Sequence, residues 1–302
     1  MNTKPSVSII MPAYNAAKTI SDSIQSVLNQ TYTDWELIII NDGSSDSTSS
    51  IVGAYPDPRI ILLEQQNSGV AEARNNGIRH ARGNMIAFLD SDDLWIETKL
   101  EKFMLFIQQQ NFCGLAYSKI RYFSDNPADS LPYNPWEPFH EINPYHNLLL
   151  IDYIPTLTVM VNKIIFDEVG LFDKNFFGTE DWDMWLRIVK KHPIALISEE
   201  LSLYRNHESG ISKKFDRQHQ QQYNVMQKHL LNDQNIAIVL KKKGLWLWTS
   251  YLFVHRLKNF QILDAFGVYI KMISLLPFSS VHARFTIMLF QNYLNRFFKN
   301  HC

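Results

Sequence analysis

The carboxylates of Asp90, Asp92 and Asp93 are the first side chains of this sequence whose type and spacing could do chemistry. They directly follow the apolar run 85–89, which is long enough for a strand buried on both faces. Ligands of open α/β sheets bind outside the carboxyl ends of the strands, where this cluster would lie. Carboxylate oxygens suit Mg²⁺ or Mn²⁺ carrying a diphosphate. The alternative is that Asp90 caps a turn and the other two acids cap a helix beginning near Trp95.

The chain upstream of these acids alternates between strand-like and helix-like segments. The expected strands are 7–11, 35–40, 60–63 and 85–89, and the expected helices are 20–28 and 70–80. Strict alternation predicts an α/β fold with a mostly parallel central sheet and helices on both faces. Pro12 has no backbone N–H to donate, so we expect the first strand to end there.

Polar residues follow three of the expected strands. Tyr14 and Asn15 come after the first strand, Asn41 and Asp42 after the second, and the three acids after the last. Because the carboxyl ends of parallel strands share one edge, these residues should converge on one nucleotide-type crevice with an acidic metal site. The sequence has no G-x-G-x-x-G after the first strand and no G-x-x-x-x-G-K-[ST], which argues against dinucleotide dehydrogenases and P-loop kinases.

Composition and charge indicate a globular chain with two different parts. The 302 residues are 46% apolar and 13% aromatic, enough to bury a core. Residues 235–302 hold nine Lys or Arg and one acid, which leaves 20 basic and 29 acidic residues elsewhere, so the net charges are +8 and −9. Two cysteines, Cys113 and Cys302, predict neither a disulfide framework nor a zinc site. We expect a catalytic domain over 1–232 and a basic, aromatic-rich helical extension over 233–302.

Five motifs in this order resemble family 2 glycosyltransferases. They are Val7–Asn15, Ser26–Thr31, Ile40–Asp46, Asn67–Gly69 with Ala73–Asn75, and Phe88–Asp93. The resemblance covers residues 5 to about 212. It implies the GT-A fold and transfer of a sugar from a nucleotide donor with inversion at the sugar carbon. The Q-x-x-R-W motif of processive polysaccharide synthases is absent from the sequence, so we expect one sugar to be added per encounter.

The resemblance implies a nucleotide site at the ends of the first strands. Tyr14 would stack on a uracil-type base, and Asp42 would accept a hydrogen bond from the imide N–H of that base. Pro12, Asn15 and Ser91 belong to the same implied set of nucleotide-binding residues. The alternatives are that Tyr14 is a core aromatic and that Asp42 is an Asx-turn residue.

The resemblance also implies a place for the diphosphate and for a Mn²⁺ or Mg²⁺ ion. Arg74 would reach the donor diphosphate, which calls for a permanent positive charge; its alternative is a solvated arginine on a helix surface. Asp90 would lie toward the ribose and Asp92 on the metal ion. Asp93 would assist the donor site or cap a helix. The ion would neutralise the nucleoside diphosphate as it leaves.

A second acidic pair, Glu180 and Asp181, lies far along the chain. An E-D pair in this position carries the catalytic base in the family, which implies that Asp181 takes the proton from the acceptor hydroxyl and that Glu180 orients the acceptor. A helix N-terminus would keep Asp181 ionised at neutral pH. The alternative is that both acids serve only to start a helix that Thr179 caps.

Further contact residues are expected in two segments. The Pro- and aromatic-rich stretch 124–147 makes Trp136 a candidate acceptor contact, although its aromatics could simply pack that loop. Trp182 is a candidate donor or acceptor contact. The run Leu203–Ser212 resembles the family's Y-R-x-H…S segment, so Arg205 is a candidate diphosphate contact and His207 a candidate metal ligand, with a purely structural histidine as the alternative.

The basic tail raises the question of a membrane partner. Its longest nearly apolar run, 244–254, is too short to span a bilayer. Lys, Arg and aromatic residues over 235–302 fit peripheral contact with an anionic membrane, and they also fit a helical cap or a homodimer interface. No nucleic-acid motif accompanies the basic residues, so we expect no nucleic-acid partner. The N-terminus lacks a charged-then-apolar leader, which predicts a cytoplasmic protein, peripheral on the inner face of the membrane if the tail binds lipid.

Together these features predict a metal-dependent, inverting glycosyltransferase. The expected donor is a nucleotide sugar, UDP-linked, and the expected acceptor is a hydroxyl of a glycan or lipid-linked glycan in cell-surface polysaccharide synthesis. One rival is a sugar nucleotidyltransferase, which would need a basic triphosphate loop after the first strand, where 12–19 offers only Lys18. The other is a non-catalytic, membrane-associated or nucleotide-sugar-binding scaffold, against which the acids Asp90, Asp92 and Asp181 argue.

Overall fold

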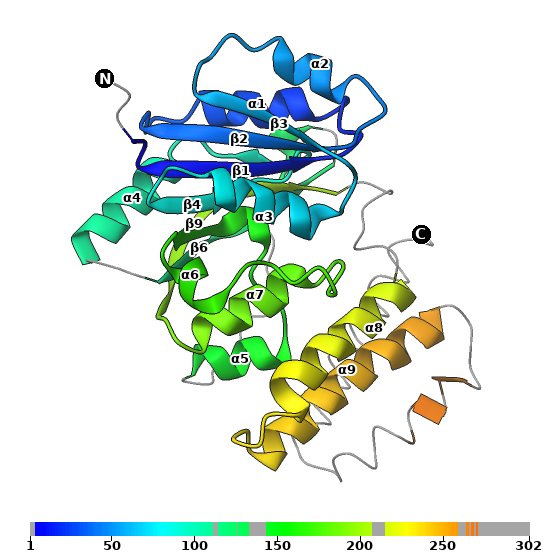
Figure 1. Ribbon diagram of the computed structural model, residues 1–302. Helices are drawn as coiled ribbons and strands as arrows, with labels where there is room; N and C mark the ends of the chain where they lie inside the picture. The colour runs from blue at the N-terminus through cyan, green and yellow to red at the C-terminus, as the bar shows by residue number, and fades with distance from the viewer. Residues whose placement is uncertain are drawn as a thin grey trace. The chain divides into compact units, whose positions relative to one another are not determined.

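The computed structural model divides the chain into two compact units, residues 1–221 and 222–302, each of which is described by itself (Figure 1). The boundary expected at 232/233 falls inside the second unit. The structure describes residues 4–110, 114–124, 126–132, 143–206 and 215–258, together with 264, 265, 267, 268 and 270.

The first half of the first unit follows the predicted alternation. Its elements are β1 (Val7–Ala13), α1 (Ile20–Leu28), β2 (Trp35–Asp42), α2 (Thr48–Gly53), β3 (Ile60–Gln65), α3 (Val70–His80) and β4 (Met85–Phe88). The strands pair in parallel in the order β3-β2-β1-β4. The expected parallel sheet is therefore confirmed for this half, and its strand ends share one edge.

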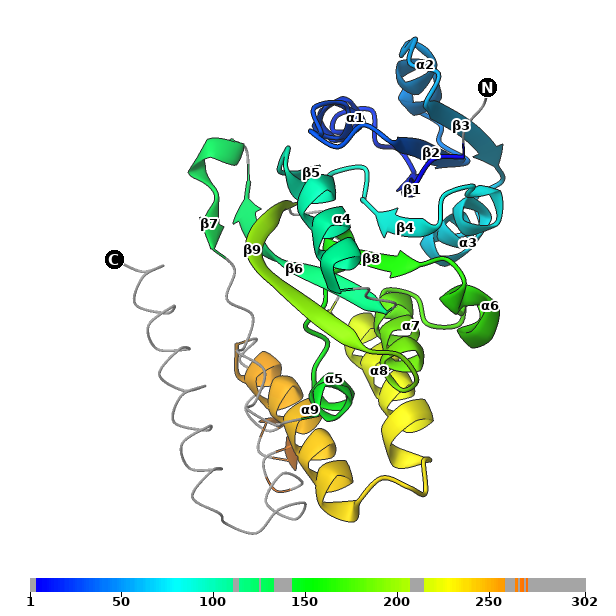
Figure 2. The same ribbon diagram turned by 90° about the vertical axis from the view of Figure 1, so that its left-hand side faces the viewer.

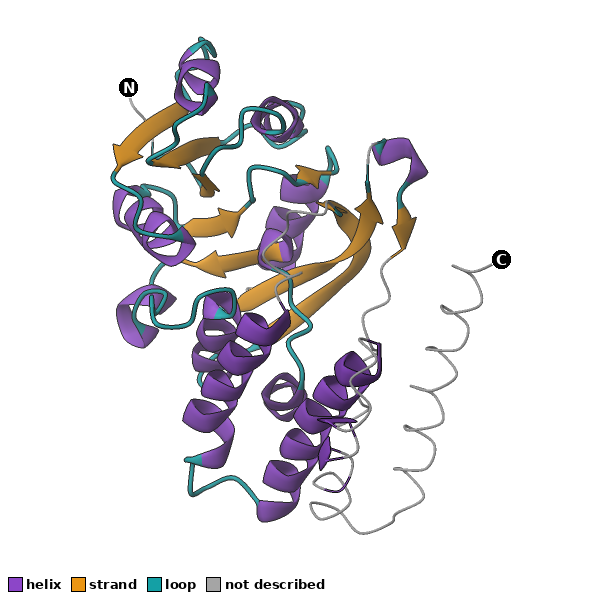
Figure 3. Cartoon of the chain, turned by 90° about the vertical axis from the view of Figure 1, so that its right-hand side faces the viewer, coloured by secondary structure: helices purple, strands orange, loops and turns teal. Residues whose placement is uncertain are grey.

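The second half adds strands that run in both directions. Its elements are β5 (Leu94–Trp95), α4 (Lys99–Gln110), β6 (Leu115–Phe123), η1 (Pro127–Asp129), β7 (Leu131–Pro132), α5 (Pro144–Leu150), η2 (Thr156–Thr158), β8 (Val159–Asn162), α6 (Ile165–Val169), α7 (Glu180–Val189) and β9 (Ile194–Arg205). Strand β8 lies antiparallel between β4 and β6, β9 is parallel to β6, and β5 is antiparallel to β9. Within the described residues the sheet is thus parallel at one end and mixed at the other, and Figure 3 shows it curling between the two.

Helices cover both faces of the sheet, as predicted. Alternate residues of β1, including Ile9, pack with Ile24 of α1 and Phe103 of α4 on one face. Helix α3 covers the other face, opposite α1 and α4 (Figure 2). Its Gly77 lies so close to Ile10 that an added Cβ would come within 2.5 Å of the Ile10 side chain. The Phe88 ring of β4, also on this face, packs T-shaped with the Phe172 ring, with centroids 5.4 Å apart, and its centroid lies 6.1 Å from that of the Trp185 ring of α7.

Two local expectations are wrong. Pro12 does not end the first strand, because β1 continues to Ala13 and Pro12 pairs with Ile40. The carbonyl of Ile10 faces β4, so the nitrogen of Pro12 two residues later faces the same side, where β4 has already ended, and its missing donor is not needed. No helix begins near Trp95, which lies in β5; the next helix, α4, begins at Lys99.

The second unit is helical where it is described. Helix α8 (Phe215–Met226) crosses into it, followed by the π-helical turn η4 (Gln227–Leu231) and α9 (Ile238–Lys258). The rings of Tyr223 and Trp248 pack with centroids 4.8 Å apart. Among the helices that the structure describes, none combines the length and apolarity that crossing a membrane requires.

Candidate active site

The loops after β1 and β2 are joined by Asn15, the one non-glycine residue of the described chain with a positive φ, at 50°. Its backbone N–H donates to Ser44 Oγ at 2.9 Å, and its Oδ1 accepts from the Ser45 N–H at 2.8 Å. Next to it, Tyr14 is 55% exposed, so its ring is not a core aromatic. Pro12 is buried inside β1. The two loops therefore present one polar surface from which the Tyr14 ring projects.

Asp42 ends β2 and holds the loop that leads into α3. Its Oδ1 accepts hydrogen bonds from Gln65 Nε2 at 2.7 Å and from the Ser68 N–H at 2.8 Å, and its Oδ2 accepts from the Gly69 N–H at 2.9 Å. This is not an Asx turn within its own loop. A carboxylate offers about four acceptor positions, and the described residues occupy three of those of the buried Asp42.

The acid loop, Asp90–Asp93, follows β4 at the same edge. The carbonyl of Ser91 accepts from Thr19 Oγ1 at 2.9 Å, and that of Asp92 accepts from Arg205 Nε at 2.7 Å. Asp93 is buried, and its carboxylate accepts from the Arg205 N–H at 2.8 Å. Burial first, and then the charges of Asp92 and Asp90, raise the pKa of Asp93 well above its usual range. Three acids in one loop repel one another, and a bound cation would relieve that repulsion.

Arg74 connects the acid loop to α7. Its Nη2 donates to Asp90 Oδ1 and its Nη1 to Glu180 Oε1, both at 2.8 Å. The residue is 4% exposed, so it is not a solvated surface arginine. Burial lowers the pKa of Arg74, but the charges of Asp90, Glu180 and Asp181 outweigh it and raise the pKa. Within the described residues its buried Nε has no hydrogen-bond partner.

The acids at the start of α7 do not simply cap the helix. Thr179 occupies the N-cap position, but its buried hydroxyl has no partner in the described chain. Glu180 is buried, and besides Arg74 its Oε2 accepts from the Gly178 N–H at 2.6 Å. Asp181 accepts from Thr156 Oγ1 at 2.8 Å and from the Trp182 N–H at 2.8 Å. Both acids are therefore tied to residues distant in sequence.

The pKa of Asp181 differs from the expectation based on its helix N-terminus. That position alone predicts a low pKa, but burial raises the pKa of Asp181, with Arg74 and the Thr156 hydrogen bond acting against the rise. Burial likewise raises the pKa of Glu180, again opposed by Arg74. A carboxylate with a raised pKa holds a proton more readily, which suits a group that must accept one during a reaction.

A third acid at this place, Asp152, was missed by sequence reasoning. Burial first, and then the charge of Asp181, raise the pKa of Asp152 well above its usual range. The residue as a whole is exposed, and its carboxylate lies close enough to Asp181 to feel its charge. It stands alone between α5 and η2 with no recognisable motif around it, so no sequence signal singled it out.

The segment 148–157, from the last turn of α5 into η2, is held by three tryptophan side chains. Trp182 Nε1 donates to the Leu148 carbonyl at 2.7 Å, Trp185 Nε1 to the Ile154 carbonyl at 3.1 Å, and Trp95 Nε1 to the Leu157 carbonyl at 2.9 Å. Two of these indoles come from α7 and the third from β5, directly after the acid loop. Trp182 is 3% exposed, which leaves its ring without an open face for a sugar.

The remaining predicted residues fall into two groups. Trp136 and His207 lie outside the described residues. Arg205, the last residue of β9, binds protein groups: besides its bonds to the acid loop, its Nη2 pairs with Asp22 Oδ2 at 3.1 Å, and its guanidinium lies 4.5 Å from the centroid of the Phe123 ring. Arg205 thus holds the acid loop in place through hydrogen bonds to its backbone and to Asp93.

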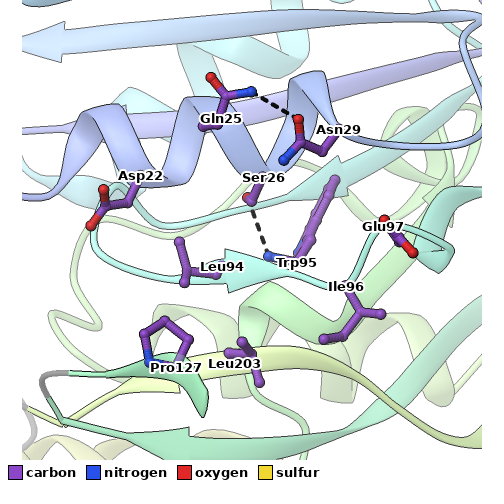
Figure 4. Close-up of a pocket in the computed structure, with 10 residues that line it drawn as sticks. All are labelled: Asp22, Gln25, Ser26, Asn29, Leu94, Trp95, Ile96, Glu97, Pro127 and Leu203. Carbon is purple, nitrogen blue, oxygen red and sulfur yellow. Dashed lines mark hydrogen bonds between the residues drawn. The ribbon is translucent and has the colours of Figure 1, made fainter.

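A cavity of about 610 Å³ lies at β5, which directly follows the acid loop in the chain, and Asp22, the partner of Arg205, is one of its lining residues (Figure 4). It is lined by one face of α1, by β5 and the two residues after it, and by Pro127 and Leu203. Carboxylates, carboxamides and the Ser26 hydroxyl supply its polar groups, and none of the described residues that line it is Lys or Arg, so its chemistry does not suit a phosphate. Neither the acid loop nor Glu180 or Asp181 is among those lining residues.

The acid loop has the donor chemistry for a divalent cation. In the part of the chain that the structure describes, no three His, Cys, Asp or Glu side chains converge as a complete ligand set. Mg²⁺ commonly binds through one or two carboxylates and takes its other ligands from water and substrate phosphates. Asp90 and Asp92, both partly exposed at the sheet edge, fit that pattern.

Comparisons with known proteins agree with this geometry. The family model described as Glycosyl transferase family 2 matches residues 8–169. The Escherichia coli protein WfgD, a UDP-Glc:alpha-D-GlcNAc-diphosphoundecaprenol beta-1,3-glucosyltransferase, is 37% identical over 223 residues, which are 73% of this chain and 85% of WfgD.

Two solved structures share the fold. S. aureus TarS in complex with UDP-GlcNAc aligns with 90% of this chain and 79% of its own, with a TM-score of 0.63 and 19% identity. The mannosyltransferase PcManGT from Pyrobaculum calidifontis, in complex with GDP-Man and Mn²⁺, aligns with 97% of this chain and 81% of its own, with a TM-score of 0.63 and 18% identity. The expected GT-A fold is confirmed.

Proposed function

Since the chain belongs to glycosyl transferase family 2 and is a glycosyltransferase, we propose that it moves one sugar from a UDP-linked donor to a hydroxyl of a lipid-linked glycan, with inversion and with a divalent cation. The observation that carries this proposal is the bridge that Arg74 makes between Asp90 of the acid loop and Glu180 of α7. The bridge joins a group of acids suited to a metal–diphosphate to the start of α7, where the neighbouring Asp181 is suited to proton transfer.

Asp181 is proposed as the general base. The acceptor hydroxyl gives its proton to the Asp181 carboxylate while its oxygen forms a bond to the sugar carbon, and the bond from that carbon to the diphosphate oxygen breaks on the opposite side. The nucleoside diphosphate leaves with the bonding electrons. The raised pKa of Asp181 supports this role, because a more basic carboxylate takes the proton more readily.

The acid loop is proposed to hold the donor phosphates and the cation. Asp92, assisted by Asp90, would bind Mn²⁺ or Mg²⁺, and the ion would neutralise charge on the leaving diphosphate. Arg74, with its buried Nε, lies beside Asp90 and adds positive charge there. Glu180, whose two oxygens bind Arg74 and the Gly178 N–H, is proposed to position Arg74 rather than to contact the acceptor.

The donor nucleotide is proposed to be UDP. The exposed ring of Tyr14 offers a stacking surface, and the remaining acceptor position of Asp42 suits a uracil N–H. WfgD uses UDP-Glc by its name, and TarS binds UDP-GlcNAc, which supports the same choice here. The acceptor of WfgD is a diphosphoundecaprenol-linked GlcNAc, so a lipid-linked glycan of a cell-surface polysaccharide is the proposed acceptor class.

A lipid-linked acceptor implies work at a membrane surface, proposed to be the inner face of the cytoplasmic membrane. At the start of α9, Ile238 and Val239 are 65% and 69% exposed and precede the three lysines 241–243. Exposed apolar groups beside lysines suit an anionic lipid surface. An Ile238→Ser/Val239→Ser variant should co-sediment less with phosphatidylglycerol vesicles than the wild type does. If the same surface instead forms a homodimer, the sedimentation coefficient of the protein without vesicles should change in this variant.

The first test is UDP release from UDP-glucose, UDP-GlcNAc and UDP-galactose, in Mn²⁺ or in EDTA. Slow turnover of one donor by the wild type, lost in EDTA and in Asp92→Ala but kept in the surface variant Asp57→Ala, is the expected result. Failure to bind UDP and to release it from any donor would contradict the proposal and favour the scaffold. Release of pyrophosphate from UTP and a sugar phosphate would favour the nucleotidyltransferase.

A further inference from the structure

Within the described residues, the carboxylate of Asp181 has one hydrogen-bond partner outside its own helix. Its Oδ1 accepts from the N–H of the next residue, Trp182, and its Oδ2 accepts from Thr156 Oγ1, both at 2.8 Å. Thr156 is 5% exposed and lies in η2, 25 positions earlier in the chain. The helix supplies one contact, and the Thr156 hydroxyl supplies the second that fixes the plane of the carboxylate.

The position of Thr156 is itself fixed by the tryptophans that hold the segment 148–157. Trp182 and Trp185, on the same helix as Asp181, bind the carbonyls of Leu148 and Ile154. Trp95 binds the carbonyl of Leu157, next to Thr156. Helix α7 therefore carries both the carboxylate and two of the groups that hold the segment bearing its hydroxyl partner. Side-chain hydrogen bonds of this kind lock a reactive group in one orientation before substrate arrives.

We propose that Thr156 is a positioning residue for the general base: its hydroxyl directs the Asp181 carboxylate so that the unoccupied lone pairs face the acceptor hydroxyl. This inference rests on the proposed function of Asp181. In the transfer step the acceptor proton passes to Asp181, the new carbon–oxygen bond forms, and the old one breaks with release of the nucleoside diphosphate. Thr156 keeps its own proton throughout, because it only donates a hydrogen bond to the ionised carboxylate.

Charged groups from several elements face Asp181 and set the pH at which it works. Arg74 comes from α3, Asp90 from the acid loop, Glu180 from the same helix, and Asp152 from the segment 148–157. Arg74 and the Thr156 hydroxyl favour the ionised carboxylate, whereas Asp90 disfavours it. Loss of the hydroxyl should therefore move the acidic limb of the pH profile to higher pH, in addition to lowering the rate.

The test compares three substitutions at Thr156 with one at Thr158. Thr156→Val keeps the shape and removes the donor, Thr156→Ser keeps the donor, and Thr156→Cys offers a weak donor. Thr158→Val is the matched control, because Thr158 lies in the same turn and donates from Oγ1 to the Pro155 carbonyl at 2.7 Å rather than to Asp181. Each variant is assayed for transfer from the UDP-sugar that the wild type turns over, from pH 5 to 9.

We expect kcat to fall about 10- to 100-fold in Thr156→Val, the range for a hydrogen bond to a charged group, with the donor KM within about threefold. The acidic limb should move to higher pH, Thr156→Ser should restore both readouts, and Thr158→Val should resemble the wild type. If Thr156→Val does not fold, Thr156→Cys is compared with Thr156→Ser instead. A lower kcat and an acidic limb at higher pH in Thr156→Cys would then support the inference. Equal behaviour of the Thr156 and Thr158 variants would overturn the inference.

An Asp181→Asn variant separates this inference from the proposed function. If it abolishes transfer while the Thr156 variants behave like the control, only the role of Thr156 fails. If it retains transfer at the wild-type rate, the assignment of the base fails, and the inference fails with it.

Discussion

Arg74 Nη1 lies 2.8 Å from Glu180 Oε1, although the two residues are 106 positions apart in the chain. The same guanidinium binds Asp90, so one buried arginine connects the acid loop to the helix that carries Asp181. The proposed donor side and the proposed acceptor side of the site are thereby held together by a single side chain. Changes at Arg74 should consequently affect stability and both halves of the reaction.

Replacement of Arg74 by Met should cost roughly 3 kcal/mol of the free energy of unfolding, because Glu180 would be left buried and without its partner. Urea denaturation at pH 7 measures this loss. Arg79→Met is the matched control on the same helix, since Arg79 is 47% exposed and pairs with the partly exposed Glu72, a type of pair worth at most about 1 kcal/mol.

A second substitution checks the cause of the loss at Arg74. Glu180→Gln in the Arg74→Met background should recover part of the stability, since a neutral amide costs less to bury than an unpaired carboxylate. No recovery would mean that packing of the arginine, not its charge, supports the site.

Lys99 should make stability depend on pH. It is fully buried, donates to Ser202 Oγ at 3.1 Å, and burial lowers its pKa well below the ordinary 10.5. Between the lowered pKa and 10.5 the unfolded chain binds a proton that the folded chain does not, so the free energy of unfolding rises with pH in that window, by up to about 1.4 kcal/mol per pH unit.

Replacement of Lys99 by Met should remove that slope, measured by urea denaturation at a series of pH values up to 10. Lys102→Met, at a surface lysine of the same helix that pairs with Glu199, should leave the slope unchanged. An unaltered slope in Lys99→Met would show that Lys99 keeps its proton in the folded chain and would refute the prediction.

Loss of the hydrogen bond from the Trp185 indole N–H should lower stability and activity even when an aromatic ring remains at this position. Trp185→Phe removes the donor to the Ile154 carbonyl and should lower both the free energy of unfolding, by about 1–2 kcal/mol, and kcat. Trp35→Phe is the matched control, because in the described residues the buried Trp35 Nε1 has no acceptor to lose. The prediction is contradicted if both variants lose the same stability and keep the same kcat.

As the pH is lowered, activity should begin to fall at a higher pH than it would if the general base had the ordinary pKa of aspartate. Asp181 must be ionised to act as base, and burial raises its pKa, so the protonated, inactive form accumulates as the pH drops through that raised value. We expect the acidic limb of the pH profile of kcat/KM to lie above pH ~3.9, the ordinary pKa of an aspartate. Circular dichroism at each pH checks that the chain stays folded, and a limb at or below that value would rule out the assignment.

The parallel half of the fold could be predicted because local patterns determine it. The apolar spacing of Ile20, Ile24 and Val27 identified α1, and the run 85–89 identified β4. The antiparallel insertion of β8 between β4 and β6 could not, because the short apolar run 159–162 carries no sign of its partners or direction.

The site could be predicted only where a motif marked it. Arg74, Asp90 and Glu180 were identified, and the structure brings them into contact. Their mutual bridge was not foreseen, because it depends on how two distant helices pack. Thr156 and Asp152 were missed for a similar reason: each is an isolated polar residue whose meaning comes from the nearby Asp181.

The pairing of β5 with β9 has a consequence for the order in which the site is completed during synthesis. Leu94 and Trp95 pair with Leu203 and Ser202, and the Arg205 N–H binds Asp93, so the acid loop depends on a strand that leaves the ribosome much later. The nascent chain can assemble its four parallel strands first. It cannot fix the acids proposed to bind the donor until α7 and β9 have also emerged. A partly translated chain would therefore have little capacity to hydrolyse nucleotide sugars wastefully.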